Sequence, residues 1–148
     1  MNLPGRVIAA VALAAMLTGC ISPARNQPQY EQKAVQALEA ASSEVATSLL
    51  TVRQHERHKI MSAYADEVIT SSENTAGSIS TAFGSVQPPD HTSDEVRKGV
   101  MDQLSGAQNA ITDARIAVRR DDDASLRTAA DELSSAAKGL AALTERLK

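Results

Sequence analysis

The sequence contains few of the residues from which disulfide frameworks and stacking surfaces are built. Among its 148 residues are one cysteine, no tryptophan, two tyrosines and one phenylalanine. A single thiol cannot form a disulfide framework within the chain, and so few rings argue against a stacking platform for bases or sugars. The net charge is only −3. Because nucleic-acid-binding proteins usually carry a clustered basic surface, we expect no nucleic-acid partner.

Long apolar runs are also missing. The longest, Val7–Leu17, has eleven residues. A helix needs about 20 apolar residues to cross roughly 30 Å of hydrocarbon, so this run is too short to span a membrane. It follows a short polar segment containing Arg6 and precedes the small residues Thr18 and Gly19. A basic start, a short apolar run and small residues are typical of an export signal that is later removed.

The only cysteine, Cys20, stands directly after this segment. Leu17, Thr18, Gly19 and Cys20 resemble the lipobox of bacterial lipoproteins. The resemblance implies that residues 1–19 are a lipoprotein signal peptide and that Cys20 becomes the first residue of the mature chain, with a diacylglyceryl group on its sulfur. The alternatives are an ordinary secretory signal or a buried N-terminal helix with an incidental cysteine. A short apolar run with these flanks favours the lipoprotein.

A covalent lipid on Cys20 would be the chain's anchor, and we expect no other cofactor. Two acyl chains bind a bilayer stably where a single chain is marginal, and bacteria that acylate the new amino group add a third. The next residue is Ile21 and not Asp, which by the same resemblance does not signal retention at the inner membrane. We therefore expect a cell-envelope protein on the outer leaflet of the cytoplasmic membrane, or on the outer membrane if the organism has one.

The remainder of the chain is long enough for one domain. Arg6 is the only charged residue among residues 1–19, so their removal leaves 129 residues with 14 basic and 18 acidic side chains. Residues 20–29 contain two prolines and no periodicity, and are expected to form a lipidated tether. Alanine is abundant beyond them and favours closely packed helices, because it loses no side-chain entropy. We predict an all-α, up-and-down bundle of three or four helices over residues 30–148, with helices at about 30–53, 59–86, 93–120 and 123–147.

Apolar residues recur at spacings of three and four within each predicted helix, the pattern of a helix with one buried face. In the last two helices the spacing is close to a heptad and the stripe is rich in alanine, which predicts a coiled-coil-like hairpin. The expected core positions are Val35, Leu38, Ser42, Val45, Leu49 and Val52; then Met61, Tyr64, Val68, Ser72, Thr75, Ile79, Ala82 and Val86; then Val96, Val100, Leu104, Ala107, Ile111, Ala114 and Val118; and last Leu126, Ala130, Leu133, Ala137, Leu140, Leu143 and Leu147.

Helix boundaries are marked by proline and by capping residues. The pair Pro88–Pro89 ends the second helix because proline cannot continue it. Thr92 and Glu95 have the spacing of a capping box, which predicts the start of the third helix. Arg119–Arg120 stand at the end of that helix, where positive charge is favourable. In the run Asp121–Asp123, Asp122 or Asp123 is the expected N-cap of the last helix.

The segment 53–59 contains no apolar residue and joins the first two stripes. It has no Gly or Pro, so a turn between two helices and the exposed middle of one long helix both remain open. The two stripes are out of phase across the segment, which favours a bend or tight turn.

Two motifs contain residues that can bind metal ions, residues 55–58 and residues 121–123. His55 and His58 would share a face of a helix beside Glu56, but His-Glu-Arg-His is one residue short of the zinc protease motif, and the third histidine, His91, is expected in a distant loop. The pattern favours a solvated polar patch over a metal site. The run Asp121–Asp123 lacks the Gly and the later Glu of a calcium-binding loop. Helix capping and pairing with Arg119 and Arg120 explain it better.

No nucleophile, acid and base converge in any motif, so we predict no enzyme. Segments such as YADEVIT, FGSVQPP and ARIAVRRDD are similar to small exported helical proteins of high-GC Gram-positive bacteria, a resemblance that implies no activity. The leading hypothesis is a non-enzymatic envelope lipoprotein that binds or scaffolds another envelope component, identity unknown. The alternative is a small-ligand or metal-binding bundle that uses the patch of His55, Glu56 and His58.

Overall fold

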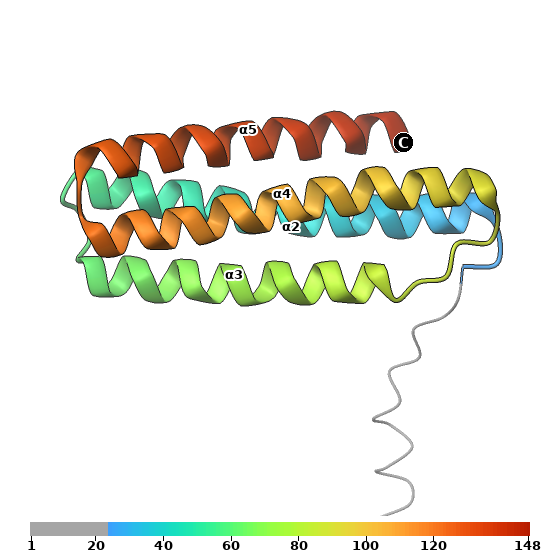
Figure 1. Ribbon diagram of the computed structural model, residues 1–148, viewed down its shortest axis with the longest axis horizontal. Helices are drawn as coiled ribbons and strands as arrows, with labels where there is room; N and C mark the ends of the chain where they lie inside the picture. The colour runs from blue at the N-terminus through green and yellow to red at the C-terminus, as the bar shows by residue number, and fades with distance from the viewer. Residues whose placement is uncertain (1–23) are drawn as a thin grey trace, which may run out of the picture.

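The computed structural model describes residues 24–148, which form four α-helices packed as an up-and-down bundle (Figure 1). The helices are α2 (Gln27–Glu56), α3 (Ser62–Gly84), α4 (His91–Arg120) and α5 (Asp123–Leu147). The predicted all-α bundle is confirmed: of the predicted three or four helices, the described residues form four. The lipobox residues Leu17, Thr18, Gly19 and Cys20 lie outside the described residues.

Helices α2 and α4 form the centre of the bundle. Each of them contacts the other three helices, whereas α3 and α5 do not touch each other within the described residues. In Figure 1, α3 (green) and α5 (red) lie on opposite sides of the α2–α4 pair. The start of α2 lies at one end of the bundle, and the turns that join α2 to α3 and α4 to α5 lie at the other. We refer to this second end as the turn end.

The first helix begins three residues earlier than predicted, because proline is favourable in the first turn of a helix. Asn26 caps α2 by accepting a hydrogen bond from the Gln29 N–H at 3.1 Å, and Pro28 occupies the first turn. The first N–H groups of a helix have no intrahelical acceptor, so a proline there loses nothing. The expected tether therefore overlaps the helix by three residues.

Residues 57–61 form a turn, which decides between the two alternatives left open for residues 53–59. The Lys59 N–H donates to the Gln54 carbonyl at 2.9 Å and the His58 N–H donates to the His55 carbonyl at 2.8 Å. These two bonds are the Schellman pattern that ends many helices with a left-handed residue. Here that residue is His58, with φ 52°, so the glycine that usually signals this turn is absent from the sequence.

The capping box predicted at Thr92 and Glu95 is wrong. Helix α4 begins two residues earlier, and its N-cap is Asp90, whose Oδ1 accepts the Ser93 N–H at 2.8 Å. Aspartate is as good an N-cap as the hydroxyl residues, and its position directly after Pro89 allows the helix to start sooner. His91, expected in a loop, is consequently the first residue of α4.

The predicted core faces of α4 and α5 agree with the structure. Val100, Leu104, Leu133 and Leu140 are buried, and α5 spans the predicted residues 123–147. Ten of the fourteen predicted positions on these helices are buried, and the other four are partly buried and pack against the core: Val96, Ala130, Ala137 and Leu147.

The core face predicted for the second helix is correct at Ser72 and Val86, which are buried, and at Ile79, which packs against the core, but its first part is wrong by one position. Met61 and Tyr64 are 77% and 59% exposed, while Ala65 and Ile69 are fully buried. The buried stripe continues through Ser72, Ala76 and Phe83. It is built mostly from small residues, so the larger Met and Tyr side chains one position away gave a stronger but misleading pattern. Met61 is therefore not a core residue, whereas Met101 of α4 is partly buried against the core.

Candidate functional site

A groove lies between α4 and α5 on the described part of the chain, and a wider hollow of about 890 Å³ lies beside α3, between Glu73 and Ser85. The groove encloses about 520 Å³, and a second hollow of about 410 Å³ continues it toward the turn end. Asp113, Thr128 and Glu132 line both. The first hollow is lined by Asp102, Gln103, Gly106, Ala107, Asn109, Ala110, Asp113, Thr128, Asp131, Glu132, Ser135 and Ala136. We call the two together the α4–α5 groove.

Small residues create this groove. Ala107 and Ala110 are buried on α4, and Ala136 lines the groove from α5. A Cβ atom added at Gly106 would meet nothing within 4 Å, so this position is open space. Residues three and four apart on a helix share a face, and short side chains along such a face leave a depression between the two helices.

The charge along the first hollow is of one sign. Asp102, Asp113, Asp131 and Glu132 line it and are exposed, and no Lys or Arg does. Arg120 lines the continuation near the turn end. Four carboxylates along a groove with an apolar floor suit a partner that carries both positive charge and small apolar contact surface.

The carboxylates of the groove do not form a metal site. Within residues 24–148, no group of three or more His, Cys, Asp or Glu side chains is placed to hold a metal ion. The groove also brings no histidine or cysteine beside its hydroxyl groups.

His55 lies at the turn end and is buried, not solvated as the sequence suggested. Only 5% of the residue is exposed. Its Nδ1 lies 3.2 Å from the main-chain oxygen of Ile60, and its Nε2 lies 2.7 Å from Oδ1 of Asp121. Sequence analysis missed this contact because the two partners are 66 residues apart and the histidine was assigned to an exposed patch.

The structure separates the three histidines. His58 is exposed in the turn after α2, and His91 begins α4 at the opposite end of the bundle. Both ring nitrogens of His55 already face protein oxygens. Glu56 is the last residue of α2. The arrangement therefore brings no set of metal ligands to the patch of His55, Glu56 and His58.

The acidic run Asp121–Asp123 has three separate roles. Asp121 ends α4 with φ 54° and bonds to His55, Asp122 is the N-cap of α5 through its bond to the Ser125 N–H at 2.9 Å, and Asp123 is the first residue of α5. The predicted capping is confirmed for Asp122. The predicted pairing of this run with Arg119 is wrong, because that arginine binds Asp66.

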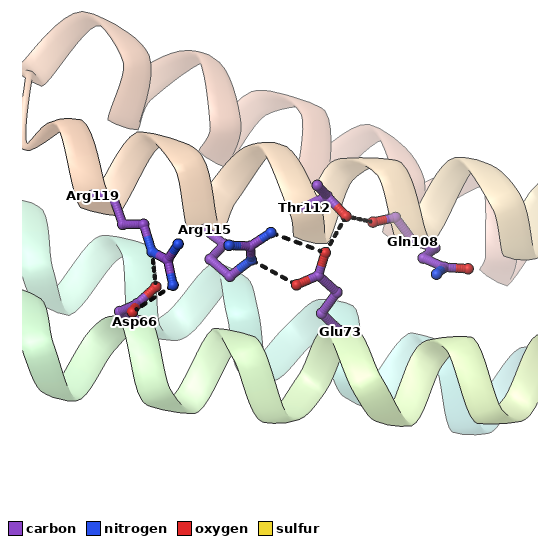
Figure 2. A network of polar contacts seen from close by, with 6 residues as sticks. All are labelled: Asp66, Glu73, Gln108, Thr112, Arg115 and Arg119. Carbon is purple, nitrogen blue, oxygen red and sulfur yellow. Dashed lines mark hydrogen bonds and ion pairs between the residues drawn. The ribbon is translucent and has the colours of Figure 1, made fainter.

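A network of polar side chains joins α3 to α4 (Figure 2). Arg115 Nε donates to Glu73 Oε2 at 2.6 Å, and the Thr112 hydroxyl donates to Glu73 Oε1 at 2.6 Å. One helical turn after Arg115, Arg119 forms a bidentate ion pair with Asp66 of α3: its Nε and Nη2 atoms donate to the two carboxylate oxygens at 2.7 and 3.1 Å. Glu73 thus has both of its carboxylate oxygens bonded to α4.

The network stabilises the charged form of both carboxyl groups. For Asp66, the hydrogen bond from Arg119 lowers the pKa below its ordinary value. For Glu73, burial opposes ionisation, but the hydrogen bonds from Thr112 and Arg115 outweigh it and the pKa is lowered. The Asp66 carboxylate in turn raises the pKa of Arg119. The three groups thus remain charged together.

Comparison of the chain with protein-family models, with curated proteins and with solved structures finds no match. Within residues 24–148, no helix combines the length and the apolar character that crossing a membrane requires.

Proposed function

We propose that this chain is a lipid-anchored protein of the bacterial cell envelope, a binding or scaffolding module that takes another envelope component into the α4–α5 groove and catalyses no reaction. The observation that carries the proposal is the groove itself: an open depression with a floor of small residues and four exposed carboxylates along its first hollow. The lipid part of the proposal rests on the resemblance of residues 17–20 to a lipobox.

The charges indicate what kind of partner would fit. Exposed carboxylates attract Lys and Arg side chains and raise the rate of association with a basic surface, while they discriminate against acidic partners. The floor of Gly106, Ala107 and Ala110 would allow a partner backbone to approach closely. A basic segment of another envelope protein therefore matches the groove in charge and in shape.

The alternative of a metal or small-ligand site at His55 and His58 has no observation in its favour. The His55 ring nitrogens have protein partners, and His58 stands on the exposed side of the turn. We therefore do not adopt it.

Blocking the groove without disturbing the helix tests the binding proposal. A photoreactive amino acid at Asn109, which lines the groove and is exposed, should form adducts with a partner in living cells. In the same chain, Gly106→Gln should reduce these adducts at least about ten-fold, equivalent to about 1.4 kcal/mol of binding free energy. The Gln side chain would occupy the open space above Gly106, and adduct yield would be measured by immunoblotting and mass spectrometry.

Gly99 supplies a matched control. It lies on the same helix and also has open space around its Cβ position, but it does not line either hollow of the groove. Both substitutions replace a helical glycine by a better helix former, so neither should lower the Tm. Gly99→Gln should keep the adducts of the unchanged chain. Equal loss in the two variants, or no more adduct at Asn109 than at the exposed Ser71 on α3, would contradict the proposal.

A further inference from the structure

The two turns at the turn end of the bundle are bonded together through one buried ring. His55 comes from the last turn of α2, Ile60 from the turn that leads to α3, and Asp121 from the end of α4. The ring of His55 lies between the other two, with Nδ1 3.2 Å from the Ile60 carbonyl oxygen and Nε2 2.7 Å from Asp121 Oδ1. These three residues are the His55 latch.

To donate to both oxygen atoms of the latch, the His55 ring must carry a proton on each nitrogen. A carbonyl oxygen only accepts hydrogen bonds, so Nδ1 must carry a proton to bond with Ile60. An ionised carboxylate also only accepts, and a neutral imidazole has one N–H and one lone pair. With a single proton, one of the two nitrogens would therefore turn its lone pair toward an oxygen. The side chain of Asp121 is 64% exposed, and water stabilises its charged form, so the second proton belongs on the ring.

We propose that the His55 latch is a pH-dependent device: doubly protonated His55 bonds both to the α2–α3 turn and to the end of α4, and loss of one proton breaks one of these two bonds. Histidine is the side chain whose charge ordinarily changes between about pH 5 and 8. Loss of one proton removes one of the two hydrogen bonds of the latch. The link between the two turns is thus stronger while the ring is doubly protonated and weaker once one proton is lost.

The backbone adopts an unfavourable conformation on both sides of the latch. His58 and Asp121 adopt positive φ angles of 52° and 54°, and they are the two non-glycine residues among residues 24–148 that do so. Residues other than glycine occupy this region at a conformational cost and persist there when surrounding contacts require it. The bonds of His55 to Ile60 and Asp121 are contacts of that kind.

The other charged groups at this end of the bundle do not replace Asp121. On α4, Arg119 is paired with Asp66 of α3, and Asp122 is engaged as the cap of α5. On α2 and in its turn, Arg53, Arg57, His58 and Lys59 are exposed and Glu56 is half-buried; on α4 and α5, Arg120 and Asp123 are exposed. Asp121 is the charged group in hydrogen-bond contact with the ring.

The test compares the full chain with its Asp121→Asn variant, both purified in mild detergent so that any lipid is accommodated. Asparagine tolerates a positive φ angle, so the variant keeps the end of α4 and loses the charge that pairs with the ring. Urea unfolding is measured at pH 5.5 and pH 8. Between these values the unfolding equilibrium constant of the unchanged chain should rise roughly three- to ten-fold more than that of Asp121→Asn, the equivalent of one hydrogen bond.

Direct observation of the ring completes the test. Nitrogen-15 NMR at pH 5.5 should show both His55 nitrogens protonated, with the signal identified by its absence from His55→Gln. His58→Asn, whose side chain also suits a positive φ angle, and His91→Ala should keep the pH dependence of the unchanged chain. Identical pH dependence of the unchanged chain and Asp121→Asn, or a singly protonated His55 ring at pH 5.5, would overturn the proposal.

Discussion

At the scale of single residues, Glu73 links α3 to α4. It is half-buried and binds Thr112 and Arg115 together. Exposed ion pairs contribute little because water screens them and the side chains lose freedom. By contrast, only 21% of the Glu73 side chain and 22% of that of Arg115 are exposed, so this pair is less screened than the one between Lys148 and Glu39 on the surface.

Glu73→Gln should destabilise the bundle by about 1–2 kcal/mol near neutral pH, because a carboxylate that accepts charged hydrogen bonds becomes an amide. The pKa of Glu73 is lowered in the folded chain. Its contribution is therefore present above the pKa of the unfolded chain and is lost as the pH falls through the lower, folded value. The free energy of unfolding of the unchanged chain should accordingly decrease in acid, and more steeply than that of Glu73→Gln.

Urea denaturation followed by circular dichroism at pH 3 to 7 measures both effects. Glu67→Gln is the control, since Glu67 is exposed on the same helix and should change stability little. Parallel acid profiles for Glu73→Gln and the unchanged chain would show that the network contributes nothing.

At the scale of helices, short polar side chains decide where α2, α4 and α5 begin. Asn26, Asp90 and Asp122 each accept a backbone N–H three residues later. Those bonds lower the pKa of Asp90 and of Asp122. Helix α3 has no such cap: it starts after Met61 without a side-chain hydrogen bond. Its position instead follows from the turn before it and from its network with α4.

Asp90→Ala should therefore lower the Tm by about 2–4 °C, because an N–H group at the start of α4 loses its acceptor. Thr92→Ala should leave the Tm unchanged within error, since α4 begins before Thr92 and the cap is Asp90. The two variants differ by two positions in the same segment. Differential scanning calorimetry distinguishes the structure's cap from the capping box suggested by the sequence. A larger effect of Thr92→Ala would favour the capping box.

At the scale of the whole molecule, the bundle has two distinct ends and a side groove. The chain enters at the start of α2, at the end of the bundle toward which α5 runs; Lys148 at the end of α5 contacts Glu39 of α2, and the turn end lies opposite (Figure 1). Helix α4 extends over 30 residues, about 45 Å at 1.5 Å per residue. A lipid on Cys20 would then place the entry end nearest to the membrane, and the groove would extend away from it along α4 and α5.

Replacement of Cys20 by Ala should move the full chain from the membrane fraction to the soluble fraction of bacterial cells, since the proposed anchor is a lipid on Cys20 and two acyl chains suffice to hold a protein on a bilayer. Ser22→Ala, two residues away, should remain with the membranes. Fractionation followed by immunoblotting measures the distribution, and intact mass spectrometry of the membrane-bound chain should show lipid on Cys20 and the loss of residues 1–19. Membrane binding unchanged in Cys20→Ala, or an unmodified thiol on an unprocessed chain, would exclude the anchor.

The sequence alone determined the features that depend on neighbouring residues. The cores of α4 and α5 were predictable because leucine and valine recur there at helical spacing, and local periodicity is independent of the rest of the fold. The capping of α5 by Asp122 was predictable for the same reason. The resemblance of residues 17–20 to a lipobox is likewise local, and it stays a prediction.

Only the tertiary structure decided the features that join distant segments. Three of the five buried residues of α3 are small, so contact with α2 and α4, and not hydrophobicity, selects Ala65 over Tyr64. His55 meets Asp121 across 66 residues. The α4–α5 groove forms where short side chains of two helices come together. Such contacts leave no periodic pattern in the sequence, because each depends on how the helices pack against one another and not on the residues next to it in the chain.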